Sequence, residues 1–161
     1  MKGQLEMFTK STTLEEARAR LREGVREGTW CPCCDRWAQA YWRTINKTMA
    51  SGLQWLAMRA GMETGYYVDI TTAPAWLLRS NQLATLRWWG LIERAPNDDP
   101  KKKSSGMWAL TNLGRHFIRG NVAVPRRVCT LFGDVVDQSD DTITVHDIQH
   151  HFDYMEVLRG E

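Results

Sequence analysis

Residues 66–120 read YYVDITTAPAWLLRSNQLATLRWWGLIERAPNDDPKKKSSGMWALTNLGRHFIRG, and this stretch decides the fold. Four of its first five residues are aromatic or β-branched, which favours a strand. A threonine pair followed by Pro74 is typical of a helix start and predicts a short helix through Leu78. Ser80 and Asn81 then offer a turn and a new helix cap.

A second helix is predicted between this turn and Gly90. Leu83 and Leu86 are three residues apart, so both would face inward from one side of the helix. Gly90 accepts a positive φ and would end the helix. Leu91–Arg94 then resumes in an extended conformation, which places a strand directly after the helix pair.

The segment from Pro96 to Gly106 is predicted to be a loop, because it is polar and a central strand would not tolerate its prolines. It carries the three consecutive lysines of residues 101–103. Met107–Leu110 follows as a strand, and Thr111 can cap a last helix. The order is therefore strand, two helices, strand, basic loop, strand and helix.

Two parts of this stretch, LRWWGLIER at 86–94 and MWALTNLGRHFIRG at 107–120, resemble the core of bacterial winged-helix regulators of the MarR and PadR types. In those families a leucine–threonine pair ends the second strand of the wing, and a glycine–arginine pair starts the last helix. Here these pairs are Leu110–Thr111 and Gly114–Arg115. The resemblance implies an α+β, winged helix-turn-helix fold.

A second resemblance spans nearly the whole chain. The motif CPCC, well ahead of the winged-helix stretch, and the motif FDY near the C-terminus are similar to those of a group of bacteriophage proteins without an assigned activity. This resemblance implies a viral origin.

The winged-helix resemblance implies duplex DNA as the partner and a phage-encoded transcriptional regulator as the function. In this fold the second helix of the pair enters the major groove, and the loop between the strands reaches the phosphates. The expected groove contacts are Arg79, Ser80, Gln82, Thr85 and Arg87, and the expected phosphate contacts are Lys101, Lys102 and Lys103.

The charge distribution supports a basic DNA-binding unit. The chain has 161 residues and a net charge of only +2. Residues 79–127 contain ten Lys and Arg and three acidic residues, whereas residues 128–161 contain one Arg and eight acidic residues. A basic unit of this kind suits a polyanion, although the acidic tail could also fold back and neutralise it.

Trp88 and Trp89 suggest a rival function. They stand at the end of the second helix, where charged residues are common in the regulator families. They could pack under the wing or against the N-terminal helices. If exposed, they would anchor a protein contact, and the chain would be a protein-interaction module that binds and modulates a host protein.

The sequence gives less support to a disordered protein, a membrane or secreted protein, or an enzyme. An apolar fraction of 43% and eight tryptophans argue against disorder. There is no apolar run of membrane-spanning length and no signal-peptide pattern, so we expect no membrane partner and a cytoplasmic location, in the host cell if the protein is viral. The sequence contains no phosphate-binding glycine loop and no G-x-S-x-G nucleophile turn. We therefore expect that the protein is not an enzyme.

The segment before the winged-helix stretch contains an amphipathic helix and a cysteine cluster. The sequence TTLEE, which starts at Thr12, is a capping-box signature, and apolar residues then recur with helical spacing as far as Gly28. This helix could mediate a homodimer or cap the body of its own chain. After the cysteines, the sequence RWAQAYWRTI favours a strand that runs back as in a ribbon.

Cys31 and Cys34 have the C-x-x-C spacing of a zinc knuckle, which is half of a four-ligand zinc site. Three interpretations stay open: a zinc site completed in space or across a dimer, a metal-free turn with buried thiols, and a redox pair. A zinc ion is therefore a candidate cofactor, and the sequence indicates no other. The remaining donors that could complete the site are Cys129, His116, His146, His150 and His151.

The expected organisation has three segments. Residues 1–44 contain the N-terminal helix and the CPCC turn, and residues 45–121 form the winged helix-turn-helix, whose first helix starts at Asn46 and closes at Gly61. Residues 122–161 form an acidic appendage, with a hairpin that turns at Asp137–Asp141 and then a helix. In that helix His146 and His150 would share one face, but the zinc-protease pattern has Glu where Asp147 stands.

Overall fold

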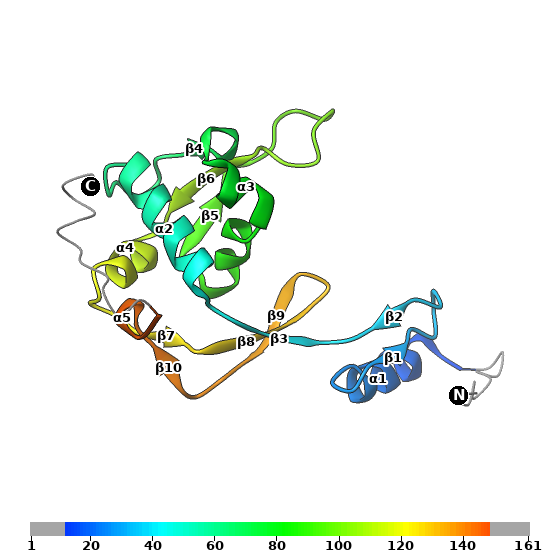
Figure 1. Cartoon of the computed structure of the whole chain (residues 1–161). Helices are drawn as coiled ribbons and strands as arrows, with labels where there is room; N and C mark the ends of the chain where they lie inside the picture. The colour runs from blue at the N-terminus through cyan, green and yellow to red at the C-terminus, as the bar shows by residue number, and fades with distance from the viewer. Residues whose placement is uncertain (1–11, 149–161) are drawn as a thin grey trace.

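The computed structural model describes residues 12–148 and shows an α+β fold (Figure 1). A body of helices around one sheet lies at one side, and an N-terminal unit extends away from it. The helical elements are α1 (Leu14–Gly24), α2 (Lys47–Arg59), η1 (Ile70–Thr72), α3 (Ala75–Ser80), η2 (Leu83–Trp89), α4 (Asn112–Ile118) and α5 (Val145–Ile148), where η denotes a 3₁₀ helix. The strands are β1 (Thr29–Trp30), β2 (Trp37–Ala38), β3 (Tyr41–Thr44), β4 (Val68–Asp69), β5 (Ile92–Arg94), β6 (Met107–Leu110), β7 (Val124–Pro125), β8 (Arg127–Leu131), β9 (Asp134–Gln138) and β10 (Thr142–Ile143).

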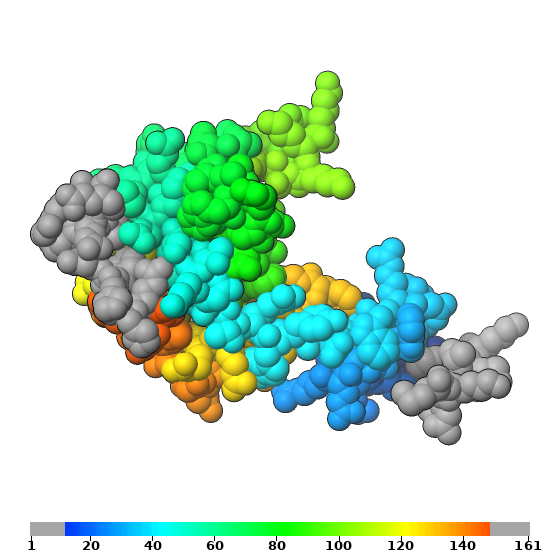
Figure 2. Space-filling view, viewed as in Figure 1, coloured from blue at the N-terminus to red at the C-terminus, as the bar shows by residue number. Residues whose placement is uncertain are grey.

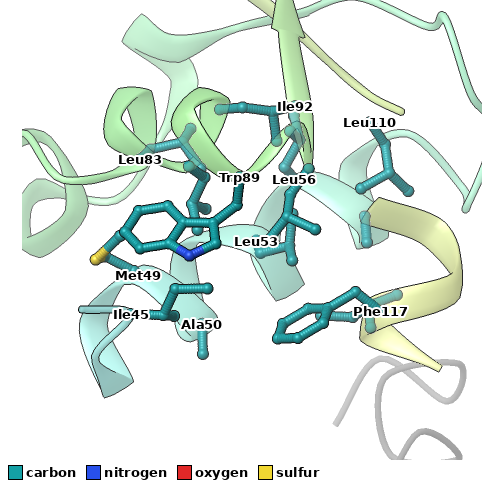
Figure 3. Packing of buried hydrophobic residues seen from close by; sticks show 14 of the residues in the cluster. Ile45, Met49, Ala50, Leu53, Leu56, Leu83, Trp89, Ile92, Leu110 and Phe117 are labelled. Carbon is teal, nitrogen blue, oxygen red and sulfur yellow. The ribbon is translucent and has the colours of Figure 1, made fainter. Parts of the chain in front are cut away.

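The body is built on an antiparallel sheet in the order β4-β6-β5. Ile92 of β5 pairs with Leu110 of β6, and both side chains are buried. The helices α2, α4 and η2 pack around this sheet and enclose the core, in which Leu53, Leu56 and Phe117 are fully buried (Figure 3). Burial of this apolar surface is the main stabilising contribution to the body.

The caps of α2 and α4 confirm the sequence predictions. The Asn46 side chain accepts a hydrogen bond from the Met49 N–H at 3.0 Å, and Gly61 follows the end of α2 with a φ of +59°. The Thr111 side chain accepts a hydrogen bond from the Gly114 N–H at 3.0 Å and starts α4. These side chains satisfy N–H groups that the first helical turn leaves without a partner.

The second helix of the pair differs from the prediction, because η2 is a 3₁₀ helix rather than an α-helix. Its buried side chains are Leu83, Leu86 and Trp89, each three residues from the next. A 3₁₀ helix has three residues per turn, so this spacing places all three on one line. Gly90, with a φ of +70°, ends the helix as predicted.

A second antiparallel sheet, in the order β3-β8-β9, joins segments that are far apart in the sequence. Tyr41 of β3 pairs with Thr130 of β8, and Thr44 pairs with Arg127. The predicted N-terminal segment, residues 1–44, and the predicted C-terminal segment, residues 122–161, therefore contribute strands to the same sheet.

The C-terminal hairpin turns at a different place from the predicted one. The prediction of a turn at Asp137–Asp141 is wrong, because β8 and β9 are joined at Phe132 and Gly133, with φ of +52° and +93°. Two consecutive residues with positive φ form the tight turn that matches the twist of a two-stranded ribbon. The next strand, β10, instead pairs with β7.

The N-terminal unit contains the predicted helix, which ends at Gly24 rather than near Gly28, and a short part of the predicted ribbon. The Thr13 hydroxyl accepts from the Glu16 N–H at 3.3 Å, and the Glu16 carboxylate accepts from the Thr13 N–H at 2.8 Å, which completes the capping box. Strands β1 and β2 form a short hairpin after α1. Figure 2 shows that this unit and the loop between β5 and β6 project on the same side of the molecule, so the surface between them is concave.

No helix within residues 12–148 is long and apolar enough to cross a membrane. His150 and His151 lie outside the described residues, as do the FDY motif and most of the predicted C-terminal helix.

Candidate nucleic-acid interface

The loop between β5 and β6, called the wing loop below (residues 95–106), presents all three predicted lysines to solvent. Its base is closed by a hydrogen bond from the Ser105 hydroxyl to the Ala95 carbonyl at 2.8 Å. Its tip is held by the Asn97 side-chain amide, which donates to the Lys102 carbonyl at 2.6 Å. The backbone of the wing loop is therefore ordered by its own hydrogen bonds, while the ammonium groups stay exposed.

Within residues 12–148, no ion pair involves a lysine of the wing loop. In the described part of the chain the ion pairs join Arg26 to Asp137 and Arg126 to Asp141. Asp69, at the start of η1, is the acidic group that interacts with Lys102. Hydrogen bonds from the Thr71 backbone and hydroxyl lower the pKa of Asp69, and the Lys102 charge lowers this pKa further.

Arg79 and Arg87 are the exposed members of the predicted groove contacts. Arg79 lies at the end of α3 and donates from Nε to the Ala75 carbonyl at 3.2 Å. The Arg87 guanidinium lies 5.3 Å from the centre of the Trp88 ring, within the range of a cation–π contact. Both guanidinium groups remain accessible to a polyanion.

Ser80 and Thr85 satisfy their hydroxyl groups locally. The Ser80 hydroxyl donates to the Leu77 carbonyl at 2.8 Å, and the Thr85 hydroxyl donates to the Gln82 carbonyl at 2.6 Å. Both residues are half-buried. In this structure both hydroxyl groups therefore donate their protons to backbone carbonyls of their own helical segments.

Gln82 and Thr85 line a cleft of about 290 Å³ between β3 and η2. The Gln82 Oε1 atom is buried there and has no hydrogen-bond partner among the described residues. The lining of this cleft is aromatic and polar, with Trp42, Arg43, Thr44, Asn46, Met49, Gln82, Thr85, Trp88 and Trp89.

The two consecutive tryptophans hydrogen-bond to the C-terminal segment, and the Trp89 ring also packs against Ile45 and against Met49 of α2 (Figure 3). The Trp89 ring is buried and donates from Nε1 to the Pro125 carbonyl at 2.8 Å. The half-buried Trp88 ring donates from Nε1 to the Gly133 carbonyl at 2.8 Å. Neither ring is therefore the exposed anchor that the interaction-module hypothesis requires.

Sequence reasoning missed the aromatic and basic side chains of β3. Arg43 lies 5.6 Å from the Tyr41 ring centre and 5.3 Å from that of Trp88, and Arg127 lies 5.2 Å from that of Trp42. The two aromatic residues followed by an arginine in AYWRT, residues 40–44, were a signal for this surface. Their packing against η2 depends on the pairing of β3 with β8 and could not be read from local pattern.

The CPCC motif forms the tight turn between β1 and β2. The Cys31 N–H donates to the Arg36 carbonyl at 2.7 Å, and the Asp35 N–H donates to the Cys31 carbonyl at 3.0 Å. Hydrogen bonds from the backbone of Cys33 and Cys34, and from the Cys34 side chain, lower the pKa of Cys31. Cys33 and Cys34 are exposed, so this turn does not bury its thiols as the metal-free hypothesis expected.

The candidate donors for a fourfold metal site are not gathered around this turn. Within residues 12–148 no group of three or more Cys, His, Asp or Glu side chains could hold a metal ion. Cys129 is buried in β8, where burial raises its pKa. His116 and His146 belong to α4 and α5, at the opposite end of the molecule from β1 and β2 (Figure 1).

We expect iodoacetamide to label Cys31 at neutral pH and Cys129 only after unfolding. The lowered pKa of Cys31 gives more reactive thiolate at a pH where an ordinary thiol is protonated, whereas Cys129 is buried and its pKa is raised. Peptide mass spectrometry of the folded and urea-unfolded chain would measure both rates. Equal labelling of the two cysteines in the folded chain would contradict this assignment.

Comparison of the chain with protein-family models, curated proteins and solved structures gives no match.

Proposed function

We propose that this protein binds duplex DNA through a winged helix-turn-helix body. The observation that supports this most directly is the arrangement of the body: α2, β4, α3, η2, β5, a basic loop and β6 follow one another, and the strands lie in the order β4-β6-β5. In winged helix-turn-helix proteins this order places the second helix of the pair and the wing on one DNA-facing side. The sequence resemblance favours a phage-encoded, non-enzymatic regulator that works in the host cytoplasm.

The proposed contact surface consists of the wing loop and the exposed arginines of α3 and η2. Lys101, Lys102 and Lys103 would contact phosphates on one side of the concave surface, and Arg79 and Arg87 would lie nearer the groove. Phosphate contacts fix the position of a protein on DNA, whereas base contacts give sequence preference. Because Gln82 and Thr85 line the cleft beside β3, we propose that affinity depends mainly on the charged side chains.

We expect the variant with Lys101, Lys102 and Lys103 all replaced by alanine to bind DNA with a weaker salt dependence. Each phosphate contact contributes about 0.9 to the slope of log K against log salt, so three lost contacts would reduce the slope by up to about 2.7. Fluorescence anisotropy with a labelled duplex over a salt series would measure this slope.

The matched control is Arg59→Ala. Arg59 is exposed at the C-terminal end of α2, away from the wing loop, and its removal also changes the net charge (Figure 1). It should leave the slope nearly unchanged. Arg59→Ala removes one charge and the wing variant removes three, so a change in slope about one third as large as that of the wing variant would show that overall charge, rather than the wing loop, controls binding.

The second candidate function is a protein-interaction module, and the exposed aromatic side chains of the N-terminal unit favour it. Trp30 and Trp37 are 61% and 46% exposed, and Tyr41 and Trp42 continue this surface along β3. Exposed aromatic groups are frequent anchors in protein interfaces. Absence of DNA binding at low salt, together with recovery of one stoichiometric host protein from nuclease-treated lysate, would support this candidate instead.

A further inference from the structure

The turn between β1 and β2 already has the form of half a metal site. The backbone hydrogen bonds between Cys31 and both Asp35 and Arg36 hold the turn closed. Asp35 has a φ of +54°, which allows the chain to reverse immediately after Cys34. The backbone and the thiols of both Cys33 and Cys34 lower the pKa of Cys31, so the three residues lie close together in the turn, and Cys31 and Cys34 have the C-x-x-C spacing that zinc sites use.

A structural zinc ion needs two more ligands than this turn supplies, since such ions are almost always bound by four ligands in a tetrahedron. Among the described residues, the cysteine and histidine donors outside this turn are badly placed. Cys129 is buried within the β3-β8-β9 sheet, and His116 and His146 lie in helices at the far end of the molecule. The missing ligands are therefore best supplied from outside this chain.

We propose that one Zn²⁺ ion joins two copies of this chain, with Cys31 and Cys34 of each copy as its four ligands. The β1-β2 hairpin belongs to the N-terminal unit and lies away from the body, where a second copy would meet it (Figure 1). Arg36 is exposed beside the cysteines and places a positive charge near the four thiolates of the assembled site.

The tryptophans that flank the turn supply an apolar contact for the second copy. Trp30 and Trp37 face each other across the hairpin, with ring centres 5.4 Å apart at 76°, and both are substantially exposed. Two such hairpins that meet at the metal would cover these rings. Binding releases the protons of the four thiols, so the affinity for zinc falls as the pH is lowered.

The proposal is tested by titration of the metal-free, reduced full-length chain with Co²⁺ and then Zn²⁺. We expect Co²⁺ to give the absorption of a tetrahedral four-thiolate complex and to saturate at one ion per two chains. Zn²⁺ should displace the Co²⁺, and sedimentation should show two chains per particle with metal and one chain after chelation.

Two variants distinguish the proposed ligand Cys34 from the adjacent Cys33, which is not proposed as a ligand. Cys34→Ser should abolish both the cobalt spectrum and the metal-dependent dimer, whereas Cys33→Ser, a change in the same turn, should keep both. Saturation at one ion per single chain would overturn the proposal and would point to ligands within the same copy. Absence of metal binding by the reduced wild-type chain would overturn it as well, and this result needs no variant to be folded.

Discussion

Replacement of Gly114 by alanine is expected to destabilise the fold by on the order of 3 kcal/mol or more, as for severe overpacking in a core. Gly114 lies in α4, where alanine would otherwise be favoured by about 1 kcal/mol. Here a Cβ atom would overlap the Leu91 carbonyl oxygen and would stand 2.9 Å from its carbonyl carbon. These are backbone atoms next to β5, so the clash cannot be relieved by rotation of a side chain.

Urea unfolding would measure this effect, with Gly61→Ala as the matched control. Gly61 has a φ of +59°, but no neighbouring atom lies within 4 Å of the position that a Cβ atom would occupy there. Its substitution should cost only the strain of the left-handed conformation, about 1–2 kcal/mol. If Gly114→Ala were as stable as the natural chain, α4 could not approach β5 as closely as described.

Replacement of Trp89 by alanine should cost about 3–5 kcal/mol, as for other large aromatic side chains removed from a core. The Trp89 ring is 5% exposed and lies among Ile45, Met49 and Leu83 in Figure 3. Its Nε1 atom also donates to the Pro125 carbonyl, so the substitution would leave a cavity and remove this hydrogen bond. Thermal or urea unfolding followed by far-UV circular dichroism would measure the loss.

Trp88→Ala is the natural comparison, because the neighbouring ring is half-buried and interacts with the Arg43 and Arg87 side chains. We expect a smaller loss of about 1 kcal/mol from these partly exposed contacts. A third variant, Trp89→Phe, would keep most of the ring volume and isolate the hydrogen bond to Pro125. Equal losses for Trp88→Ala and Trp89→Ala would contradict the different burial of the two rings.

Several elements could be predicted from local pattern because their causes are local. The capping box at Thr13, the Asn46 cap of α2 and the Thr111 cap of α4 each depend on residues three positions apart. Gly90 ends η2 with a positive φ, as its lack of a Cβ atom allows. The ribbon around CPCC formed only in part as predicted, because Trp37–Ala38 pairs with β1 whereas Tyr41–Thr44 pairs with β8.

The sequence analysis did not predict that η2 is a 3₁₀ helix, although the three-residue spacing that favours this helix type is present in the sequence. Leu83 and Leu86 would also be neighbours on an α-helix, where a three-residue spacing is allowed. Trp89 continues the same spacing, and its burial against the C-terminal segment favours the tighter helix. The position of Trp89 could not be decided until that segment was in place.

In the candidate site, too, some features follow from local sequence and others depend on contacts between distant segments. Exposure of Lys101, Lys102 and Lys103 follows from a polar, proline-containing loop, and the sequence was sufficient to predict it. The cleft that Gln82 and Thr85 line exists only because β3 pairs with β8.

By itself, therefore, the sequence determined the helix caps, the wing loop and the cysteine turn, since each depends on residues close together in the chain. Only the tertiary structure decided that Tyr41–Thr44 pairs with Arg127–Leu131 and that the tryptophans of η2 dock on the C-terminal segment. Those contacts join residues from 36 to 89 positions apart. Their formation depends on the apolar surface that the assembled elements bury together, which no local pattern specifies.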